Sequence, residues 1–144
     1  MSAPGPARLQ VGESFAREVA FDAAGIAAFA AMCGDTNPLH HDPAAAAASR
    51  FGGIIASGPQ VTSLLMGMVA DHFAALGTGV GLGFAFRLRS AVRAGETLRM
   101  HWRVTGIERK ASMRGSVVLL EGGAVRPDGT VAVTATGEVL AMDD

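Results

Sequence analysis

One polar segment, residues 33–43, holds the side chains of this sequence that are best suited to acid–base chemistry. Asp35 supplies a carboxylate and His40 an imidazole, and the two stand five positions apart. A carboxylate and an imidazole that converge on one water molecule can take a proton from it and deliver a proton to a reacting atom. Pro38 disfavours helical backbone at Asn37, so the segment is predicted to form a bent loop that lets both side chains reach the same small volume.

Residues 52–60 form a second segment of interest because they open the longest apolar stretch of the chain. Ser57 and Gln60 have the spacing of a helix capping box, and Pro59 suits the first turn of a helix because it has no N–H to leave unpaired. A helix N-terminus presents amide N–H groups that stabilise negative charge. We therefore expect this segment to supply backbone donors opposite the acid–base loop.

Neighbouring polar residues have simpler interpretations. His41 is expected to be structural or to face solvent, because its side chain points away from that of His40. A metal site formed by His40, His41 and Asp42 is not expected, since adjacent side chains diverge and no further cluster completes a ligand set. Ser57 is interpreted as a helix cap and not as a nucleophile, and Cys33 as a small packed residue near the loop.

The elements that must position these segments follow from residue spacing. The pattern predicts an edge strand, then three helices, then a run of half-buried strands in which apolar and charged residues alternate. The helices are expected from Asp22 to Gly34, from Asp42 to Phe51 and from Ser57 to Gly77. The strands are expected at 14–21, from 79 onward, after a turn at 93–96, at 116–125 and at 130–142. This order is typical of the α+β class, with an antiparallel sheet and helices on one face.

The third predicted helix is apolar over most of its surface, with Asp71 as its charged residue. A helix of this kind is expected to be buried on most sides, which suggests that the long strands wrap around it. Open sheet edges often pair between subunits, so we expect a homodimer or a higher homo-oligomer.

Composition narrows the class of protein further. The chain has 144 residues, of which 49% are hydrophobic and 17% charged, and this predicts one domain over residues 1–144. A net charge of -1 gives no field that would attract nucleic acid. One cysteine excludes an internal disulfide. No apolar run reaches the roughly 18 residues needed to span a bilayer, and the first residues show no signal peptide, so a cytoplasmic location without a membrane partner is expected.

The run from Gly34 to His40, followed by Asp42 and Pro43, resembles the signature of the MaoC-like, (R)-specific enoyl-CoA hydratases. The similarity extends from about Val11 to Leu140, and its specific part lies in residues 33–60. The resemblance implies a single MaoC-like domain with the hot-dog fold, in which an antiparallel sheet wraps a long apolar helix. That fold agrees with the element order predicted above.

The resemblance also implies roles for particular residues. Asp35 and His40 match the catalytic pair of the family, Asn37 matches an asparagine that holds the loop and the site geometry at the substrate, and Gly58 matches the glycine whose N–H binds the thioester oxygen. The implied reaction is the interconversion of trans-2-enoyl-CoA and (R)-3-hydroxyacyl-CoA through addition or removal of water. It needs no metal and no cofactor, because the substrate arrives as a thioester of coenzyme A or acyl carrier protein. Which member of the pair takes the proton from water stays open.

Two departures from the family pattern keep alternatives open. Ser57-Gly58-Pro59 stands where many members have His-Gly-Met, and Met66 stands where close relatives often have a small polar residue. One alternative is a non-catalytic acyl-thioester-binding subunit of a hetero-oligomer, and another is a hot-dog thioesterase. One or two arginines of the predicted strands could hold the phosphates of coenzyme A, among Arg87, Arg89, Arg93, Arg99 and Arg103.

Overall fold

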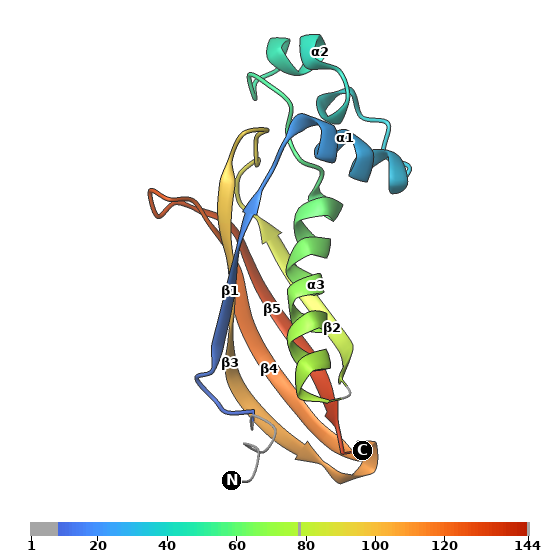
Figure 1. The fold of residues 1–144 in the computed structure, drawn as a ribbon, viewed down its shortest axis with the longest axis vertical. Coiled ribbons are helices and arrows are strands. Elements are labelled where there is room, and N and C mark those ends of the chain that lie inside the picture. The colour runs from blue at the N-terminus through green and yellow to red at the C-terminus, as the bar shows by residue number, and fades with distance from the viewer. Residues whose placement is uncertain (1–8, 78, 144) are drawn as a thin grey trace, which may run out of the picture.

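Five antiparallel strands form one sheet in the computed structural model, which describes residues 9–77 and 79–143 (Figure 1). The strands are β1 (Ser14–Ala20), β2 (Gly79–Leu88), β3 (Thr97–Lys110), β4 (Gly115–Val125) and β5 (Val131–Met142). Their spatial order is β1-β3-β4-β5-β2, so β1 and β2 are the two edges. The α+β class and the antiparallel sheet predicted from residue spacing are confirmed. The first residues, on which the expected absence of a signal peptide rests, lie outside the described part of the chain.

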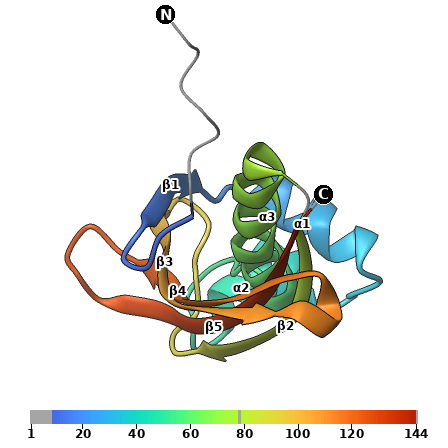
Figure 2. The same ribbon diagram turned by 90° about the horizontal axis from the view of Figure 1, so that it is seen from below.

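A long helix, α3 (Gly58–Leu76), lies inside the curve of the sheet (Figure 2). Its core-facing side chains include Leu65 and Val69, and they meet Trp102 and Met100 of β3 in one hydrophobic cluster. The indole Nε1 of Trp102 donates a hydrogen bond of 2.9 Å to the backbone oxygen of Leu65. Because Trp102 is fully buried, this bond satisfies its polar atom and fixes the helix against the sheet.

The helix is buried along one face only, so the expectation that it is buried on most sides is wrong for the described chain. The side chain of Met66 is 41% exposed, and Val80 and Leu82 of the neighbouring edge strand are 46% and 43% exposed. Met66, together with Phe84 and others, borders a hollow of about 260 Å³ between α3 and β2. The sheet ends at β2, and no further described strand covers this side of the helix.

Three short elements cap one end of the sheet: α1 (Ala23–Met32), the 3₁₀ turn η1 (Pro38–His40) and α2 (Pro43–Ala48) (Figure 1). The Asp22 carboxylate accepts the Gly25 N–H at 2.6 Å and so begins α1. The Asp42 carboxylate accepts the Ala44 and Ala45 N–H groups at 3.0 and 3.2 Å and begins α2. Both helix starts predicted from an N-terminal aspartate are therefore confirmed.

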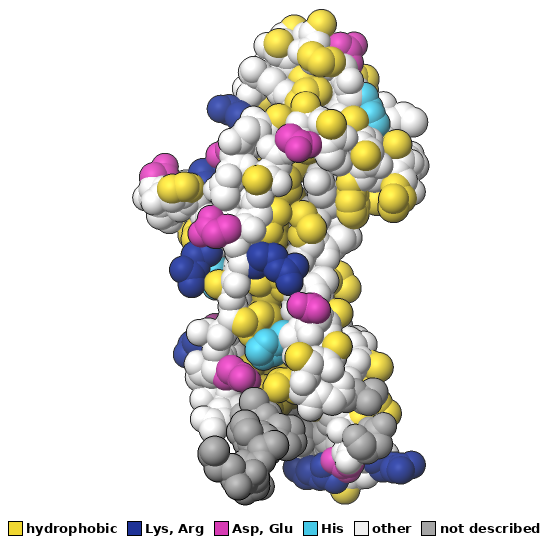
Figure 3. Space-filling model, in the orientation of Figure 1, with side chains coloured by type: hydrophobic (Ala, Val, Ile, Leu, Met, Phe, Trp, Pro, Cys, Tyr) yellow, Lys and Arg dark blue, Asp and Glu magenta, His cyan; other side chains and the backbone are white. Residues whose placement is uncertain are grey.

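Hydrophobic side chains gather on the surface of this capping end (Figure 3). Met32 is 86% exposed and Cys33 is also exposed, so the expectation of a packed cysteine is wrong. The reason is that only Ile26 and Ala30 of α1 are buried, while the C-terminal end of the helix extends away from the sheet (Figure 1). Within the described residues, no helix has the length and apolarity required to cross a bilayer.

Candidate functional site

A sharp turn after α1 places Asp35 at the start of the acid–base loop. Gly34 has a φ of 76°, in the left-handed region where glycine carries no steric penalty. The N–H groups of Gly34 and Asp35 donate to the carbonyls of Ala31 and Ala30 at 3.0 and 2.8 Å. These bonds satisfy carbonyl groups that the end of the helix would otherwise leave unpaired. The backbone of Asp35 is thus held by the end of α1, independently of the contacts that its side chain makes.

The structure brings the Asp35 and His40 side chains together. Oδ2 of Asp35 lies 3.3 Å from Nε2 of His40. The His40 side chain is 7% exposed and that of Asp35 is 31% exposed, so the pair is shielded but reachable from solvent. The distance fits the expectation that Pro38 bends the loop and lets two residues five positions apart converge.

The second ring nitrogen of His40 settles how the imidazole is oriented. Nδ1 lies 2.7 Å from the backbone oxygen of Ile55. A carbonyl oxygen only accepts hydrogen bonds, so Nδ1 carries a proton and Nε2 is the nitrogen that faces Asp35. In neutral histidine Nε2 then offers a lone pair, and an ionised carboxylate also offers only lone pairs. Both groups can therefore accept a hydrogen bond from one water molecule that lies against them.

Other residues of the loop hold this pair in place. Oδ1 of Asp35 accepts the Asn37 N–H at 3.0 Å, and Oδ1 of Asn37 accepts the Leu39 N–H at 3.1 Å. Nε2 of His41 bonds to the backbone oxygen of Asp35 at 2.7 Å. His41 therefore has the structural part expected of it. The contacts of Asn37 fit a residue that holds the loop, and a contact between Asn37 and substrate stays a prediction.

The tip of α3 supplies the backbone donor expected from the second segment. The Ser57 hydroxyl is buried and accepts the Gln60 N–H at 3.3 Å, and Pro59 has no N–H. Val61 donates to the Ser57 carbonyl at 3.4 Å. The Gly58 N–H makes no hydrogen bond to any residue within 9–77 and 79–143, so it is the free donor of the first turn. The capping box is only half formed, because the Gln60 Oε1 atom accepts no bond from the described residues.

The loop and the helix tip lie against each other. The Ile55 N–H donates to the Leu39 carbonyl at 3.1 Å, next to the bond between His40 and Ile55. Three residues of extended chain reach roughly 10 Å at most, so Gly58 starts its helix close to the acid–base pair. An acid, a base and a positively polarised amide thus lie on neighbouring segments, an arrangement suited to moving protons beside a developing negative charge.

Other predicted binding residues lie elsewhere. Arg99 and Arg103 border a hollow of about 480 Å³ with His101, on the strand positions that alternate with the buried ones. Their part in holding phosphates stays a prediction.

In the described ranges, no group of three His, Cys, Asp or Glu side chains is placed to hold a metal ion.

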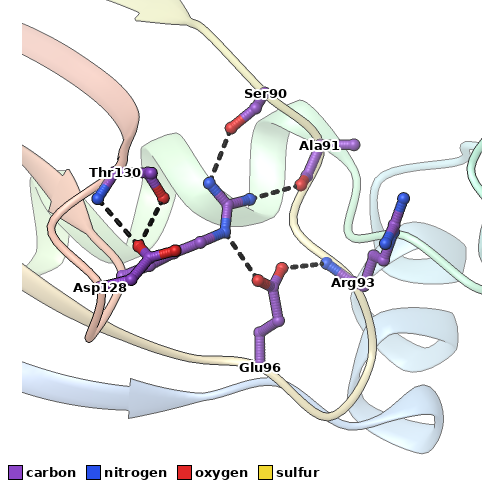
Figure 4. A network of polar contacts seen from close by, with 7 residues as sticks. Ser90, Ala91, Arg93, Glu96, Asp128 and Thr130 are labelled. Carbon is purple, nitrogen blue, oxygen red and sulfur yellow. Dashed lines mark hydrogen bonds and ion pairs between the residues drawn. The ribbon is translucent and has the colours of Figure 1, made fainter.

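A charged network that the residue spacing did not indicate fixes the turn between β2 and β3 (Figure 4). The Arg126 guanidinium donates from Nε to Glu96 Oε1 at 2.7 Å, from Nη1 to Ser90 Oγ at 2.8 Å and from Nη2 to the Ala91 oxygen at 2.7 Å. The other oxygen of Glu96, Oε2, accepts the Arg93 N–H at 2.8 Å. One arginine thus connects three points of the turn to the end of β4.

The network makes stability depend on the charge of Glu96. Burial raises the pKa of Glu96, but the hydrogen bonds from Arg126 and the Arg93 N–H outweigh it, so the pKa falls below its usual value of 4.5. A carboxyl with a lowered pKa in the folded state adds stability above the pKa of the unfolded chain and loses it as the pH falls.

We therefore expect Glu96→Gln to lower the free energy of unfolding by about 1–3 kcal/mol at neutral pH. The difference from the unsubstituted protein should shrink below about pH 4.5, the pKa of an unperturbed glutamate. Urea denaturation at several pH values measures it. A difference that stays constant down to strongly acidic pH would contradict the interpretation.

Known proteins resemble this chain in sequence and in structure. The family described as MaoC like domain matches residues 8–122. The (R)-specific enoyl-CoA hydratase of Aeromonas caviae is 31% identical over 127 residues, which cover 87% of this chain and 94% of that protein. A solved (R)-hydratase from A. caviae, involved in PHA biosynthesis, has a TM-score of 0.80 at 31% identity and covers 91% of this chain and 96% of that one. The R-hydratase PhaJ1 from Pseudomonas aeruginosa has a TM-score of 0.81 at 25% identity and covers 94% of this chain and 84% of that one.

The curved sheet, the helix that packs inside its curve and the loop at the helix tip define a protein of the hot-dog fold. The hot-dog fold predicted from the sequence is confirmed by these structures. The chain belongs to the MaoC-like family. The ChsH1-ChsH2 complex from Mycobacterium tuberculosis, at 22% identity and a TM-score of 0.79, shares the fold.

Proposed function

We propose that the protein is a hydratase/dehydratase that interconverts a trans-2-enoyl thioester and an (R)-3-hydroxyacyl thioester. The observation that carries the proposal is the 3.3 Å approach of Asp35 Oδ2 to His40 Nε2 beside the N-terminus of α3. The similarity to (R)-specific enoyl-CoA hydratase over 94% of that protein's length supports it.

Hydration requires a water made nucleophilic toward C3 of the enoyl group and a proton delivered to C2. Asp35 and His40 both bind that water, which lies beside the pair, and one of the two groups takes its proton while the other supplies the proton to C2. Because Nδ1 of His40 donates to the Ile55 carbonyl, Nε2 is the atom that exchanges protons at the site. A positioned acid or base of this kind contributes roughly 10² to 10⁴ in rate.

Negative charge develops on the thioester oxygen when water adds to C3. The Gly58 N–H, free at the positive end of α3, stabilises that charge. The same helix end holds no other free N–H in its first turn, because Pro59 lacks one and Ser57 caps Gln60. One amide therefore carries this part of the proposed mechanism.

We also propose which carrier the substrate is attached to, where the protein is located and how its subunits assemble. The substrate is a thioester of coenzyme A or acyl carrier protein, and the chemistry uses Asp35 and His40 without a cofactor. The setting is the cytoplasm, where the single cysteine fits a reducing environment. The assembly is a homo-oligomer joined along β2, a ten-residue edge strand whose exposed Val80, Leu82 and Leu88 would aggregate if left open.

A spectrophotometric assay tests the function directly. Purified protein, with its mass measured by light scattering, is given crotonyl-CoA and longer trans-2-enoyl-CoA substrates, and loss of the conjugated enoyl absorbance is followed. We expect turnover by a homo-oligomer, with a chain-length preference influenced by Met66. Release of free thiol instead would indicate a thioesterase. Absence of turnover with all substrates would favour a non-catalytic subunit of a hetero-oligomer.

A further inference from the structure

We propose that Arg126 and Glu96 are positioning residues for the acid–base pair, acting through the turn at residues 93–96. This inference rests on the function proposed above. Neither side chain contacts Asp35 or His40, so any effect on the reaction passes through the backbone of two neighbouring segments. Each segment is hydrogen-bonded both to the turn and to the catalytic loop.

The first connection leads from the turn to His40. Residues 54–56 lie antiparallel to residues 92–94: Ala94 N–H donates to the Ile54 oxygen at 2.9 Å, and Ala56 N–H donates to the Val92 oxygen at 2.8 Å. The residue between them, Ile55, accepts the Nδ1 proton of His40. The position of the Ile55 carbonyl, and with it the orientation of the imidazole, therefore depends on where the turn lies.

The second connection leads from the turn to Asp35. The Phe21 N–H donates to the backbone oxygen of Glu96 at 2.9 Å, and the Gly95 N–H donates to the backbone oxygen of Phe21 at 2.7 Å. Phe21 immediately precedes Asp22, the residue that begins α1. The other end of α1 holds the Asp35 N–H through the Ala30 carbonyl. A shift of the turn would therefore move the start of the helix that presents Asp35.

The half-buried pair of Arg126 and Glu96 fixes this turn. Their side chains are 17% and 28% exposed, and their shortest contact joins Nε and Oε1 at 2.7 Å. The planar guanidinium bonds at once to the Glu96 carboxylate, the Ser90 hydroxyl and the Ala91 carbonyl, so it ties the turn to the residues just before it (Figure 4). Lysine cannot reproduce that geometry, since its ammonium group is a single point charge. Because two connections start from one turn, a single side-chain pair controls the positions of both Asp35 and His40.

The test uses two variants and two independent measurements. In Glu96→Gln the side chain keeps its shape but cannot accept hydrogen bonds from both Arg126 and the Arg93 N–H. In Arg126→Lys the positive charge stays, but the planar group that donates to three partners is lost. We expect kcat for enoyl-thioester hydration to fall about 10- to 100-fold with little change in KM, because small displacements of reacting groups cost about this much. We also expect the His40 ring-nitrogen signal in nitrogen-15 NMR to shift as its bond to Ile55 weakens.

A matched control is the pair of Arg109 and Asp143, where Nη2 lies 2.6 Å from Oδ2 at the opposite end of β3. Asp143→Asn should leave kcat and the His40 signal as they are. Folded Glu96→Gln with both readouts unchanged overturns the proposal, and this variant decides the matter if Arg126→Lys does not fold. If the unsubstituted protein shows no turnover, the proposed function fails, and the His40 signal alone decides whether the pair positions the imidazole.

Discussion

His40→Ala is expected to lower kcat for enoyl-thioester hydration by about 10²- to 10⁴-fold, and Asp35→Asn by a similar factor. Alanine removes the Nε2 atom that faces Asp35, together with the bond to Ile55. Asparagine keeps an oxygen that can accept the Asn37 N–H, but it cannot take up or release a proton at the site. The two side chains act on one water molecule, so losing either should disable the same step.

This shared step predicts how the substitutions combine. The double variant with Asp35→Asn and His40→Ala should lose little more activity than either single variant, because residues that act as a unit are strongly non-additive. Asp143→Asn and Asp71→Asn are suitable controls, since Asp143 pairs with Arg109 and Asp71 pairs with Arg17, both on the surface. Steady-state assays on the best substrate of the panel measure all five variants. Activity retained by both single variants would refute the assignment of Asp35 and His40.

The parts of the site that were predictable are set by neighbours in the sequence. Gly34 ends α1, Pro38 bends the loop, and Ser57 caps α3, each through contacts within a few residues. Local backbone chemistry of this kind can be inferred without knowing the fold. For this reason the convergence of Asp35 and His40 could be expected before the coordinates of either were known.

The parts that were missed depend on contacts between distant segments. Arg126 and Glu96 are 30 residues apart and meet only because β3 and β4 pair in register, which brings the end of β4 beside the turn. Their sequence surroundings indicate ordinary turns. The burial of α3 was overestimated for a related reason, since periodicity shows that a helix is apolar but not how many sides its own sheet covers.

The second large effect concerns the backbone of Gly58. Gly58→Pro removes the N–H that is free at the tip of α3 and should lower kcat by about 10²- to 10³-fold, the loss typical of an oxyanion donor. Proline suits the first position of a helix, and Ser57 before it already has the extended backbone that proline requires, with a ψ of 151°. Because Pro59 follows, residue 58 must keep helical backbone directly before a proline, which is disfavoured. Circular dichroism must therefore verify that the helix still forms in this variant.

Gly58→Ala is the control that separates the N–H from the added side-chain atoms. Its Cβ would lie 2.8 Å from Cδ1 of Leu88, the far end of a flexible side chain that is 55% exposed and can move aside. Alanine keeps the N–H, so this variant should retain most of the activity that proline loses. Equal kcat values for the two variants would show that the amide does not stabilise the transition state. The acid–base pair would then act on a thioester whose oxygen is bound by some other group.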